Sequence, residues 1–528
     1  MLDRADILPV RIGRLAAEQP QRPFLQQVEG RACSYGETHR LALTWASALR
    51  SRGVEPGDTV VSLLPGGIDS VLVWLGCAWA GAYEVPCNSE YRGPMLSYLI
   101  RDATARVVVV GERYLERIAE VAPELDQLET VIVVGSGETW RPELPFTLLS
   151  AAELLAGHGP EERPAPELWD IANVVYTSGT PGPSKGVLMP WGQMLASICS
   201  TPIGDDDEVW YSPFPMFHMT GKSSLYRPAL AGGRAVLRER FSANELWDDI
   251  ARFGCRSMYM VGTMQGFVHR RPERPDDADT PLRKVVMAPV IPQYREFERR
   301  FGVRVTTVFN MSELSTPIAA GWDLPDHLTC GRVRSGYEVR IVDEHDIEVE
   351  PGELGELIVR ADQPWTLNAG YFRNPEATAR AWRNGWFHTG DGFKRDGDGY
   401  YYFVDRLNDA IRRRGENISS TEVELLVASH PDVAECAAIG VPSPLGEDDV
   451  KVVVVAREGT AIDPPELIAF LEGRVPRFML PRYVELADGL PKTLTNKVQK
   501  AALREAGVGE RTWDRERHRL TRAAGERR

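Results

Sequence analysis

Runs of consecutive apolar residues alternate with helix-like segments over the first two thirds of the chain. Val60–Leu64, Val107–Val110 and Val131–Val134 are apolar at nearly every position, which is typical of parallel strands buried on both faces. Glu37–Arg52 has its apolar residues at helical spacing, and Val71–Gly81 is an apolar helix of the kind that fills a core. This alternation predicts an α/β fold, with layers of helices on a largely parallel sheet.

The same pattern continues into the middle of the chain and then changes. Further short apolar runs predict strands at 171–176, 234–238, 257–261, 285–288 and 303–308. A linker rich in proline and charge, 157–169, precedes the first of these strands. Tyr337–Val342 and Gly355–Val359 alternate apolar and polar residues instead, as half-exposed antiparallel strands do. We therefore expect a β-rich subdomain after about residue 330.

A smaller α+β unit is predicted after Asp405. Its helices are expected at 422–429 and 465–474, and its strands at 436–441 and 450–456. The last twenty residues, 509–528, carry dense mixed charge and are predicted to form a frayed helix or a tail.

Composition narrows the function classes. With 528 residues the chain is too long for one ordinary core, and a net charge of −14 argues against a nucleic-acid coat. The seven cysteines are scattered and never spaced as Cys-x-x-Cys, so we expect a reducing compartment without disulfides or zinc. The N-terminus lacks the pattern of a signal peptide, and the most apolar run, Val71–Tyr83, is too short to span a bilayer. A cytoplasmic location is expected.

A loop rich in glycine, proline and hydroxyls follows the strand at 171–176. It runs from Thr177 to Gly186 and holds three glycines, four hydroxyls and Lys185. Glycine lets backbone N–H groups approach an anion, and the hydroxyls and the lysine add donors and charge, which suits a triphosphate. The spacing is not that of a P-loop, since Gly186 follows Lys185 where a hydroxyl is required. The alternative is a surface turn.

Five further motifs follow this loop in a fixed order. They are Pro215–Gly221 (PMFHMTG), Phe309–Glu313 (FNMSE), Trp386–Asp391 (WFHTGD), Asp405–Asp409 running into Arg414–Ser419 (RGENIS), and Pro491–Lys497 (PKTLTNK). The series resembles the AMP-forming adenylating enzymes, which include acyl-CoA synthetases, peptide-synthetase adenylation domains and luciferases. The resemblance covers roughly residues 10–505 and is greatest to bacterial carboxylate–CoA ligases of the crotonobetaine/carnitine–CoA ligase type.

The resemblance implies an ATP-dependent ligase with two domains. Residues 1–405 would bind ATP and the acid, 406–409 would form a hinge with Asn408, 410–505 would form a mobile lid, and 506–528 would be a charged tail. The enzyme would join the acid to AMP and then transfer it to CoA as a thioester, with Mg²⁺ as the metal. This chemistry makes sense because a carboxylate is a poor electrophile until AMP supplies a leaving group.

The resemblance also assigns the nucleotide site. Ser178, Thr180 and Lys185 would hold the β- and γ-phosphates, and Glu313 would bind Mg²⁺. Lys497 would be the catalytic cation, with a surface lysine as the alternative. Asp391 and Arg406 would contact the ribose. The alternative for Asp391 is an aspartate that stabilises a turn, and the alternative for Arg406 is an interdomain salt bridge. For Glu313 the alternative is an exposed carboxylate. The full set of nucleotide contacts is Thr177, Ser178, Gly179, Thr180, Gly182, Lys185, Ala288, Asn310, Met311, Ser312, Asp391, Arg406 and Lys497.

The acid would lie near a helix that begins after His218. The resemblance makes His218 a pocket and gating residue, with a structural histidine as the alternative. Val286 and Met287 replace the small residues of many relatives and should shorten the pocket, which favours a small or aromatic acid. Lys222 is expected either to meet a second anionic group of the substrate or to face solvent. The predicted pocket residues are His218, Thr220, Lys222, Ser224, Met287 and Val290.

The sequence leaves more than one acceptor of the acyl group possible. Arg412, Arg413, Arg414 and Gly415 would approach CoA phosphates, although a solvated charge run is the alternative. Pro181, Pro183, Asn408 and Asn496 depart from the family pattern without removing a reacting group. An amine or carrier-protein acceptor in secondary metabolism, or a diazotase that activates nitrite for an aryl amine, is the alternative activity. A binding protein without activity and a homodimer also remain open.

Overall fold

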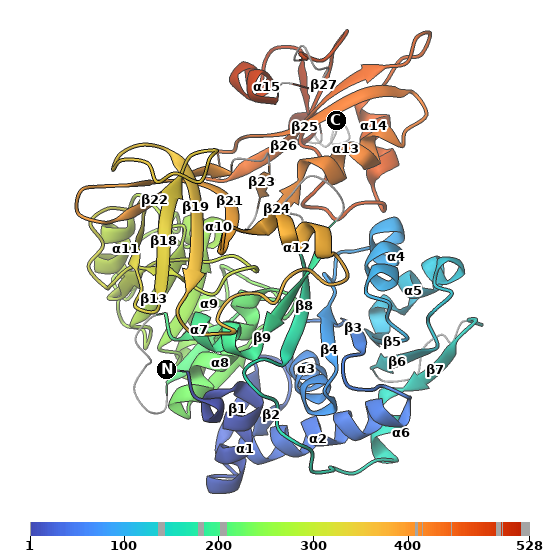
Figure 1. Cartoon of the computed structure of the whole chain (residues 1–528), viewed down its shortest axis with the longest axis vertical. Helices are drawn as coiled ribbons and strands as arrows, with labels where there is room; N and C mark the ends of the chain where they lie inside the picture. The colour runs from blue at the N-terminus through green and yellow to red at the C-terminus, as the bar shows by residue number, and fades with distance from the viewer. Residues whose placement is uncertain are drawn as a thin grey trace. The chain divides into compact units, whose positions relative to one another are not determined.

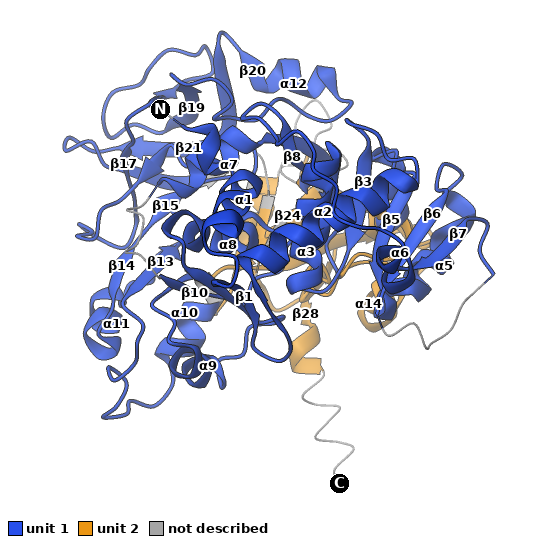
Figure 2. Cartoon of the chain, turned by 90° about the horizontal axis from the view of Figure 1, so that it is seen from below, with its two compact units in different colours: residues 1–89, 96–176, 185–405 blue, residues 90–95, 177–184, 406–528 orange. Residues whose placement is uncertain are grey.

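The computed structural model describes residues 2–135, 143–177, 184–200, 208–406, 410–413, 416–444, 446–492, 498 and 500–518. The chain divides into two compact units (Figure 2). The first unit contains Met1–Ser89, Leu96–Tyr176 and Lys185–Asp405; the second contains Glu90–Met95, Thr177–Ser184 and Arg406–Arg528.

A seven-stranded sheet begins the first unit, and its printed neighbours from β7 to β8 all pair in parallel (Figure 1). The strands in spatial order are β7 (Thr147–Ser150), β6 (Thr130–Val134), β5 (Val107–Gly111), β3 (Thr59–Leu63), β4 (Tyr83–Pro86), β8 (Ile171–Thr177) and β9 (Lys185–Pro190). The helices of this part are α1 (Leu8–Glu18), α2 (Tyr35–Ser51), α3 (Ile68–Ala80), α4 (Gly93–Asp102), α5 (Leu115–Val121) and α6 (Ala151–Ala156).

Helix α3 forms the centre of the core because it is apolar on every side. Twelve of its thirteen residues are buried, and it packs along α2, whose first turn is closed by a capping box between Ser34 and Glu37. The Trp74 ring of α3 stacks on Trp191 at a centroid distance of 5.3 Å. The apolar run therefore became a core helix, as the sequence predicted. Within the described residues, no helix has both the length and the apolar character needed to cross a membrane.

A second seven-stranded sheet is parallel except at its last pair, β1–β2. Its strands in order are β14 (Arg304–Thr306), β13 (Lys284–Ala288), β12 (Ser257–Val261), β10 (Val209–Ser212), β11 (Arg234–Leu237), β1 (Pro23–Gln27) and β2 (Ala32–Ser34). Its helices are α7 (Trp191–Ile198), α8 (Met219–Ala231), α9 (Leu246–Phe253), α10 (Gly262–His269) and α11 (Tyr294–Phe301).

The third sheet of the first unit has eight strands, and its printed pairings are antiparallel. It runs β15 (Val308–Phe309), β16 (Ile318–Ala319), β17 (Thr329–Val333), β22 (Tyr401–Arg406), β21 (Trp386–Arg395), β19 (Gly355–Ala361) and β18 (Tyr337–Val342), with β20 (Trp382–Arg383) beside β21. Helix α12 (Pro375–Ala381) precedes β20. The alternating pattern after residue 330 thus predicted the β-rich subdomain correctly.

One predicted strand, 303–308, is two strands in the structure. Arg304–Thr306 pairs with β13 in the parallel sheet, whereas Val308–Phe309 pairs with β16 in the antiparallel sheet. The chain changes sheets at Thr307, whose carbonyl accepts the N–H of Ala320 at 2.9 Å. The sequence did not reveal the break, because valine and threonine continue a strand-like pattern across it and the change of pairing partner leaves no local mark.

The second unit contains a four-stranded sheet and a hairpin. The sheet runs β25 (Val433–Pro442), β26 (Asp448–Ala456), β27 (Tyr483–Leu486) and β28 (Thr512–Asp514), and the hairpin joins β23 (Ala410–Arg413) to β24 (Glu416–Ser419). Helices α13 (Ser420–Ala428), α14 (Pro464–Leu471) and α15 (Lys500–Ala506) complete it. The α+β prediction is confirmed, but the prediction for 509–528 is wrong in part, since β28 pairs with β27 through Trp513 and Val484.

Candidate active site

Two of the predicted contacts, Ala288 and Thr177, lie at the carboxyl ends of strands with parallel partners. Ala288 ends β13 in register with Val261 at the end of β12, and Thr177 ends β8. Ligands of α/β sheets bind at these ends, because the loops that follow neighbouring strands converge there. Asn310, Met311 and Ser312 follow β15; Asn310 is exposed, and the other two are half-buried.

Lys185 and Glu313 converge on one tyrosine. The Tyr371 hydroxyl donates to Glu313 Oε1 at 3.3 Å, and Lys185 Nζ lies 5.3 Å from the centre of the Tyr371 ring. Glu313 is only 6% exposed. Burial lowers the pKa of Lys185 below its ordinary value, Arg380 lowers it further, and Glu313 opposes both. The structure thus brings together a cation and a carboxylate that lie 128 positions apart, where the sequence predicted a phosphate grip and a metal ligand.

Gly186 allows the strand that carries Lys185 to approach its neighbours. A Cβ at this position would lie 2.6 Å from Val174 Cγ1 and 3.3 Å from Phe372 Cβ. The Gly186 carbonyl accepts the N–H of Phe372 at 2.7 Å, which fixes Phe372 and the preceding Tyr371 beside β9. The close backbone approach explains a glycine that the sequence placed only in a permissive loop.

Asp391 lies on β21, next to a β-bulge, and is 3% exposed. Its N–H donates to Thr389 Oγ1 at 3.0 Å, and the Thr389 hydroxyl donates to the Leu357 carbonyl at 2.7 Å. Glu356 braces the same motif, because it contacts His388 Nδ1 at 2.9 Å and accepts the Gly390 N–H at 2.9 Å. Bulges of this kind re-aim side chains beside active sites.

The charge on Glu356 strengthens this brace. Burial alone would raise the pKa of Glu356, but the hydrogen bonds from His388 and the Gly390 N–H outweigh it and hold the pKa below its usual range. The carboxylate is therefore ionised near neutral pH, where it is the better acceptor. These hydrogen bonds therefore hold the backbone of the part of β21 that carries Asp391.

Helix α8 begins after His218, as predicted. The His218 carbonyl accepts the N–H groups of Gly221 at 3.1 Å and Lys222 at 3.3 Å, and its own backbone is extended. His218 is half-buried, and its ring lies 4.6 Å from the Phe217 ring. This arrangement fixes the position of His218 through the first turn of α8.

Gly221 is required by the fold at this turn. A Cβ there would lie 2.3 Å from the Pro215 carbonyl oxygen, and backbone cannot yield as a side-chain end does. We expect Gly221→Ala to lower stability by about 1–3 kcal/mol, the usual cost of overpacking. Thermal unfolding would measure it, with Gly321→Ala as control because a Cβ at Gly321 meets nothing within 4 Å. Equal transition temperatures for both variants would contradict the steric account.

Lys222 is neither a substrate contact nor a surface charge, so both expectations for it are wrong. It is fully buried and pairs with Glu84, with Nζ 2.5 Å from Oε2, while Ser62 donates to the other oxygen at 2.8 Å. The ammonium also lies 3.9 Å from the centre of the Trp74 ring. Burial lowers the pKa of Lys222 in spite of Glu84. The partner lies 138 residues earlier in the chain, so no local pattern pointed to it.

The other residues predicted for the acid pocket differ in how far they are buried. Thr220 is half-buried, whereas Ser224 is fully buried and donates to the Thr220 carbonyl at 2.8 Å. Met287 is also fully buried and packs with Val290 in the core under β12 and β13. Successive side chains of a strand point to opposite faces, so Val286 and Met287 cannot both shorten one pocket, as the sequence analysis expected.

Arg413 is part of the core of the second unit, so its predicted role toward CoA is wrong. It is 2% exposed, and its guanidinium pairs with Asp449 at 3.0 Å and donates to the carbonyls of Phe478 at 3.1 Å and Leu480 at 2.8 Å. Arg412 is the neighbouring residue on β23 and is exposed. Of the two arginines in the described part of this run, Arg412 has the surface that a phosphate needs.

Several predicted residues lie outside the described part of the chain. They are Ser178, Gly179, Thr180, Gly182, Asn408, Arg414, Gly415 and Lys497, and the side chain of Arg406 is likewise not described. Close to Lys497, Lys492 forms an antiparallel bridge with Val498, and Val498 packs against the cluster of Leu490 and Leu503. Lys492 and Val498 are therefore both anchored in the second unit.

Three residues of the site were missed by the sequence analysis. Tyr371, Gln193 and Asn368 contact Glu313 or the carbonyls beside it. A glutamine in the otherwise apolar helix α7 was the signal that could have pointed to Gln193, because a buried amide needs partners.

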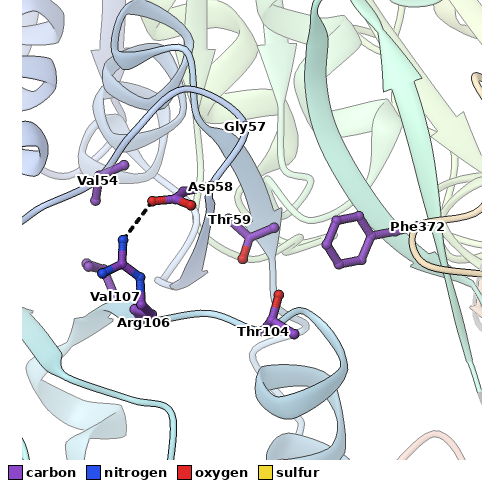
Figure 3. Close-up of a pocket in the computed structure, with 8 residues that line it drawn as sticks. All are labelled: Val54, Gly57, Asp58, Thr59, Thr104, Arg106, Val107 and Phe372. Atoms are coloured by element: carbon purple, nitrogen blue, oxygen red, sulfur yellow. Dashed lines mark hydrogen bonds and ion pairs between the residues drawn. The ribbon is translucent and has the colours of Figure 1, made fainter.

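A pocket elsewhere in the first unit is too small for a nucleotide. It lies at the amino ends of β3 and β5, where Thr59, Thr104 and Phe372 surround it and Arg106 pairs with Asp58 at 2.9 Å (Figure 3). Its volume is about 70 Å³, whereas ligand pockets usually exceed about 300 Å³. It has room for only a few water molecules. It is distinct from the site of Lys185, Glu313 and Tyr371, none of which lines it.

Comparisons with known proteins agree with this arrangement. The crotonobetaine/carnitine–CoA ligase of Salmonella agona is 28% identical over 494 residues, which cover 90% of this chain and 93% of that protein. The solved o-succinylbenzoate CoA synthetase of Bacillus subtilis superposes with a TM-score of 0.82 at 23% identity, covering 96% of this chain and 99% of that one. The amide bond synthetase McbA of Marinactinospora thermotolerans superposes with a TM-score of 0.81 at 25% identity. This match covers 94% of this chain and 99% of McbA.

The family models match both parts of the chain. The model of the AMP-binding enzyme matches residues 13–372, and the model of the AMP-binding enzyme C-terminal domain matches residues 422–497. The first match alone covers Lys185, Glu313 and Tyr371, and the second ends at Lys497. The chain belongs to the AMP-binding enzyme family.

Proposed function

We propose that the protein joins a carboxylic acid to AMP with ATP and then transfers it to CoA. The convergence of Lys185, Tyr371 and Glu313 carries this proposal, because it offers an anion-binding cation and a buried carboxylate at one place. Family membership and the ligase names of the relatives support the same reaction. We regard ATP and CoA as its co-substrates.

The first step is an attack by one oxygen of the acid on the α-phosphorus of ATP. A bond forms between that oxygen and phosphorus, the bond from phosphorus to the bridging oxygen breaks, and pyrophosphate leaves. Lys185 would bind the departing phosphates, and Lys497 would stabilise the charge on the α-phosphate and the attacking carboxylate. Asp391, Arg406 and Ser312 would orient the AMP portion, with Ala288 beside the base.

The second step transfers the acyl group. The CoA sulfur attacks the acyl carbon as its proton leaves for solvent, the carbon–oxygen bond to AMP breaks, and the thioester and AMP separate. His218, half-buried at the start of α8, would line the acyl site. Arg412 would contact a CoA phosphate, because it is exposed where Arg413 is not.

Glu313 fits a Mg²⁺ ion that is shared with ATP. Mg²⁺ is usually held by one or two carboxylates together with substrate phosphates. Glu313 is a single buried carboxylate, and among the described residues no three His, Cys, Asp or Glu side chains gather closely enough to hold a metal by themselves. The ion would neutralise charge on the phosphates as pyrophosphate leaves.

A panel of small and aromatic acids, with nitrite included, tests the proposal. We expect pyrophosphate release that depends on one group of acids, and a thioester when CoA is added. Amide formation with an added amine in place of the thioester would assign the acceptor to amines, as the name of the McbA relative indicates for that protein. Pyrophosphate release with nitrite and an aryl amine, but with none of the acids, would overturn the ligase proposal.

A further inference from the structure

Two buried amides hold the loop that carries Glu313, and the first is Gln193 of α7. Its side chain is fully buried, and Nε2 donates to the carbonyls of Ser312 and Leu314, both at 2.8 Å. Both hydrogens of the amide are therefore used, one on each side of Glu313. A buried donor would not lie in helix α7 without such partners, because an unpaired amide costs free energy.

The second amide, Asn368, binds the carbonyl of Glu313, which lies between the carbonyls of Ser312 and Leu314 in the sequence. Its Nδ2 donates to the Glu313 carbonyl at 2.7 Å, and its own N–H donates to the same oxygen at 3.2 Å. Its Oδ1 in turn accepts the Gly370 N–H at 2.8 Å and Trp382 Nε1 at 3.2 Å, so the amide cannot rotate away without losing these bonds. The three consecutive carbonyls of 312–314 are thus fixed from two directions.

These hydrogen bonds to the backbone of residues 312–314 determine the direction of the Glu313 carboxylate. The turn is closed by the Leu314 N–H, which donates to the Met311 carbonyl at 3.0 Å. With its backbone fixed, the Glu313 side chain extends to the Tyr371 hydroxyl, over whose ring Lys185 Nζ lies. A metal ligand needs such support, because a displacement of a fraction of an ångström weakens coordination.

We propose that Gln193 and Asn368 are positioning residues that set the Glu313 carboxylate for a divalent cation. The inference rests on the proposed function, in which Glu313 binds Mg²⁺. Neither amide touches the metal; each acts through the loop backbone. Partners of this kind usually change metal affinity by about 10–100-fold when they are removed.

The test measures metal binding to the full-length protein in complex with a non-hydrolysable ATP analogue. Mn²⁺ replaces Mg²⁺, and the signal of unbound Mn²⁺ in electron paramagnetic resonance gives its apparent dissociation constant. We expect Gln193→Met, which keeps the shape and removes both donors, to raise this constant about tenfold. Asn368→Leu is expected to act in the same direction and provides a second variant if the first does not fold.

Gln265 supplies the matched control. It is also fully buried, and its Nε2 donates to the carbonyls of Met260 at 3.0 Å and Pro289 at 2.7 Å, away from the Glu313 loop. Gln265→Met should therefore cost similar stability and leave the Mn²⁺ constant within about twofold, since it lacks the contact that sets metal affinity. An equal weakening by Gln265→Met would mean that general loosening, and not positioning, moves the constant, which would overturn the inference.

Glu313→Gln separates the inference from the proposed function. If Glu313→Gln weakens Mn²⁺ binding while Gln193→Met and Asn368→Leu do not, the positioning role is refuted and the ligand assignment stands. If Glu313→Gln itself leaves Mn²⁺ binding unchanged, the assignment of Glu313 as metal ligand fails, and the positioning role fails with it.

Discussion

Lys497→Ala is expected to lower the rate of acyl-adenylate formation by about 10²–10³-fold, the usual effect of removing a donor from developing charge. Thioester formation from a chemically prepared acyl adenylate should stay within a few-fold of the wild-type rate. The reason is that the lysine would act on the α-phosphate and carboxylate oxygens, whose bond is already formed in the adenylate. Single-turnover assays of the two steps measure both rates.

Lys492 offers a control from the same segment. It pairs with Glu435 at 2.8 Å in the small unit, so Lys492→Ala removes a lysine charge five positions away without a proposed role in the reaction. We expect both half-reactions of Lys492→Ala to match the wild type. Equal loss of both half-reactions in Lys497→Ala would contradict the assignment of this lysine to the first step.

Lys222→Met is expected to destabilise the protein by about 3–5 kcal/mol, because it leaves the Glu84 carboxylate buried and unpaired. The pair is fully enclosed, and the remaining carboxylate would keep only the Ser62 hydroxyl as a described partner. Glu84→Gln added to Lys222→Met should restore most of this loss, since a neutral amide in the same place carries no charge to desolvate. Chemical unfolding of the two variants measures the difference.

An exposed ion pair gives the comparison. Arg31 and Asp69 also form a salt bridge, but about half of each side chain is exposed. Arg31→Met should therefore cost no more than about 1 kcal/mol. Two results would show that the buried charge does not govern stability at this position. One is that Lys222→Met lowers the free energy of unfolding as little as Arg31→Met does. The other is that adding Glu84→Gln restores none of the loss.

The sequence predicted most of the fold because the evidence for it is local. Continuous apolar runs identified β5, β6 and β12, and the order of motifs placed Lys185, Glu313 and Asp391 in the proposed site. At Thr307, where one strand follows another directly, the pattern gave no boundary, because the change of pairing partner from β13 to β16 leaves no mark on the local sequence.

The two errors on charged residues have one physical cause. Lys222 and Arg413 were each expected to meet either a ligand or solvent, because charged side chains are rarely fully buried. Each is instead neutralised by a carboxylate far along the chain, Glu84 or Asp449, and spacing along a sequence does not reveal such partners. Gln193 was missed for the same reason, since its acceptors lie more than a hundred residues away.

The most direct test of the account follows an oxygen atom. The acid that gives the greatest pyrophosphate release is prepared with ¹⁸O in both carboxylate oxygens and incubated with the enzyme, ATP and CoA. Mass spectrometry of the nucleotide product should find AMP that carries one ¹⁸O in its phosphate, because the carboxylate oxygen stays with phosphorus when the thioester forms. Unlabelled AMP, or ADP with the label in orthophosphate, would contradict the account.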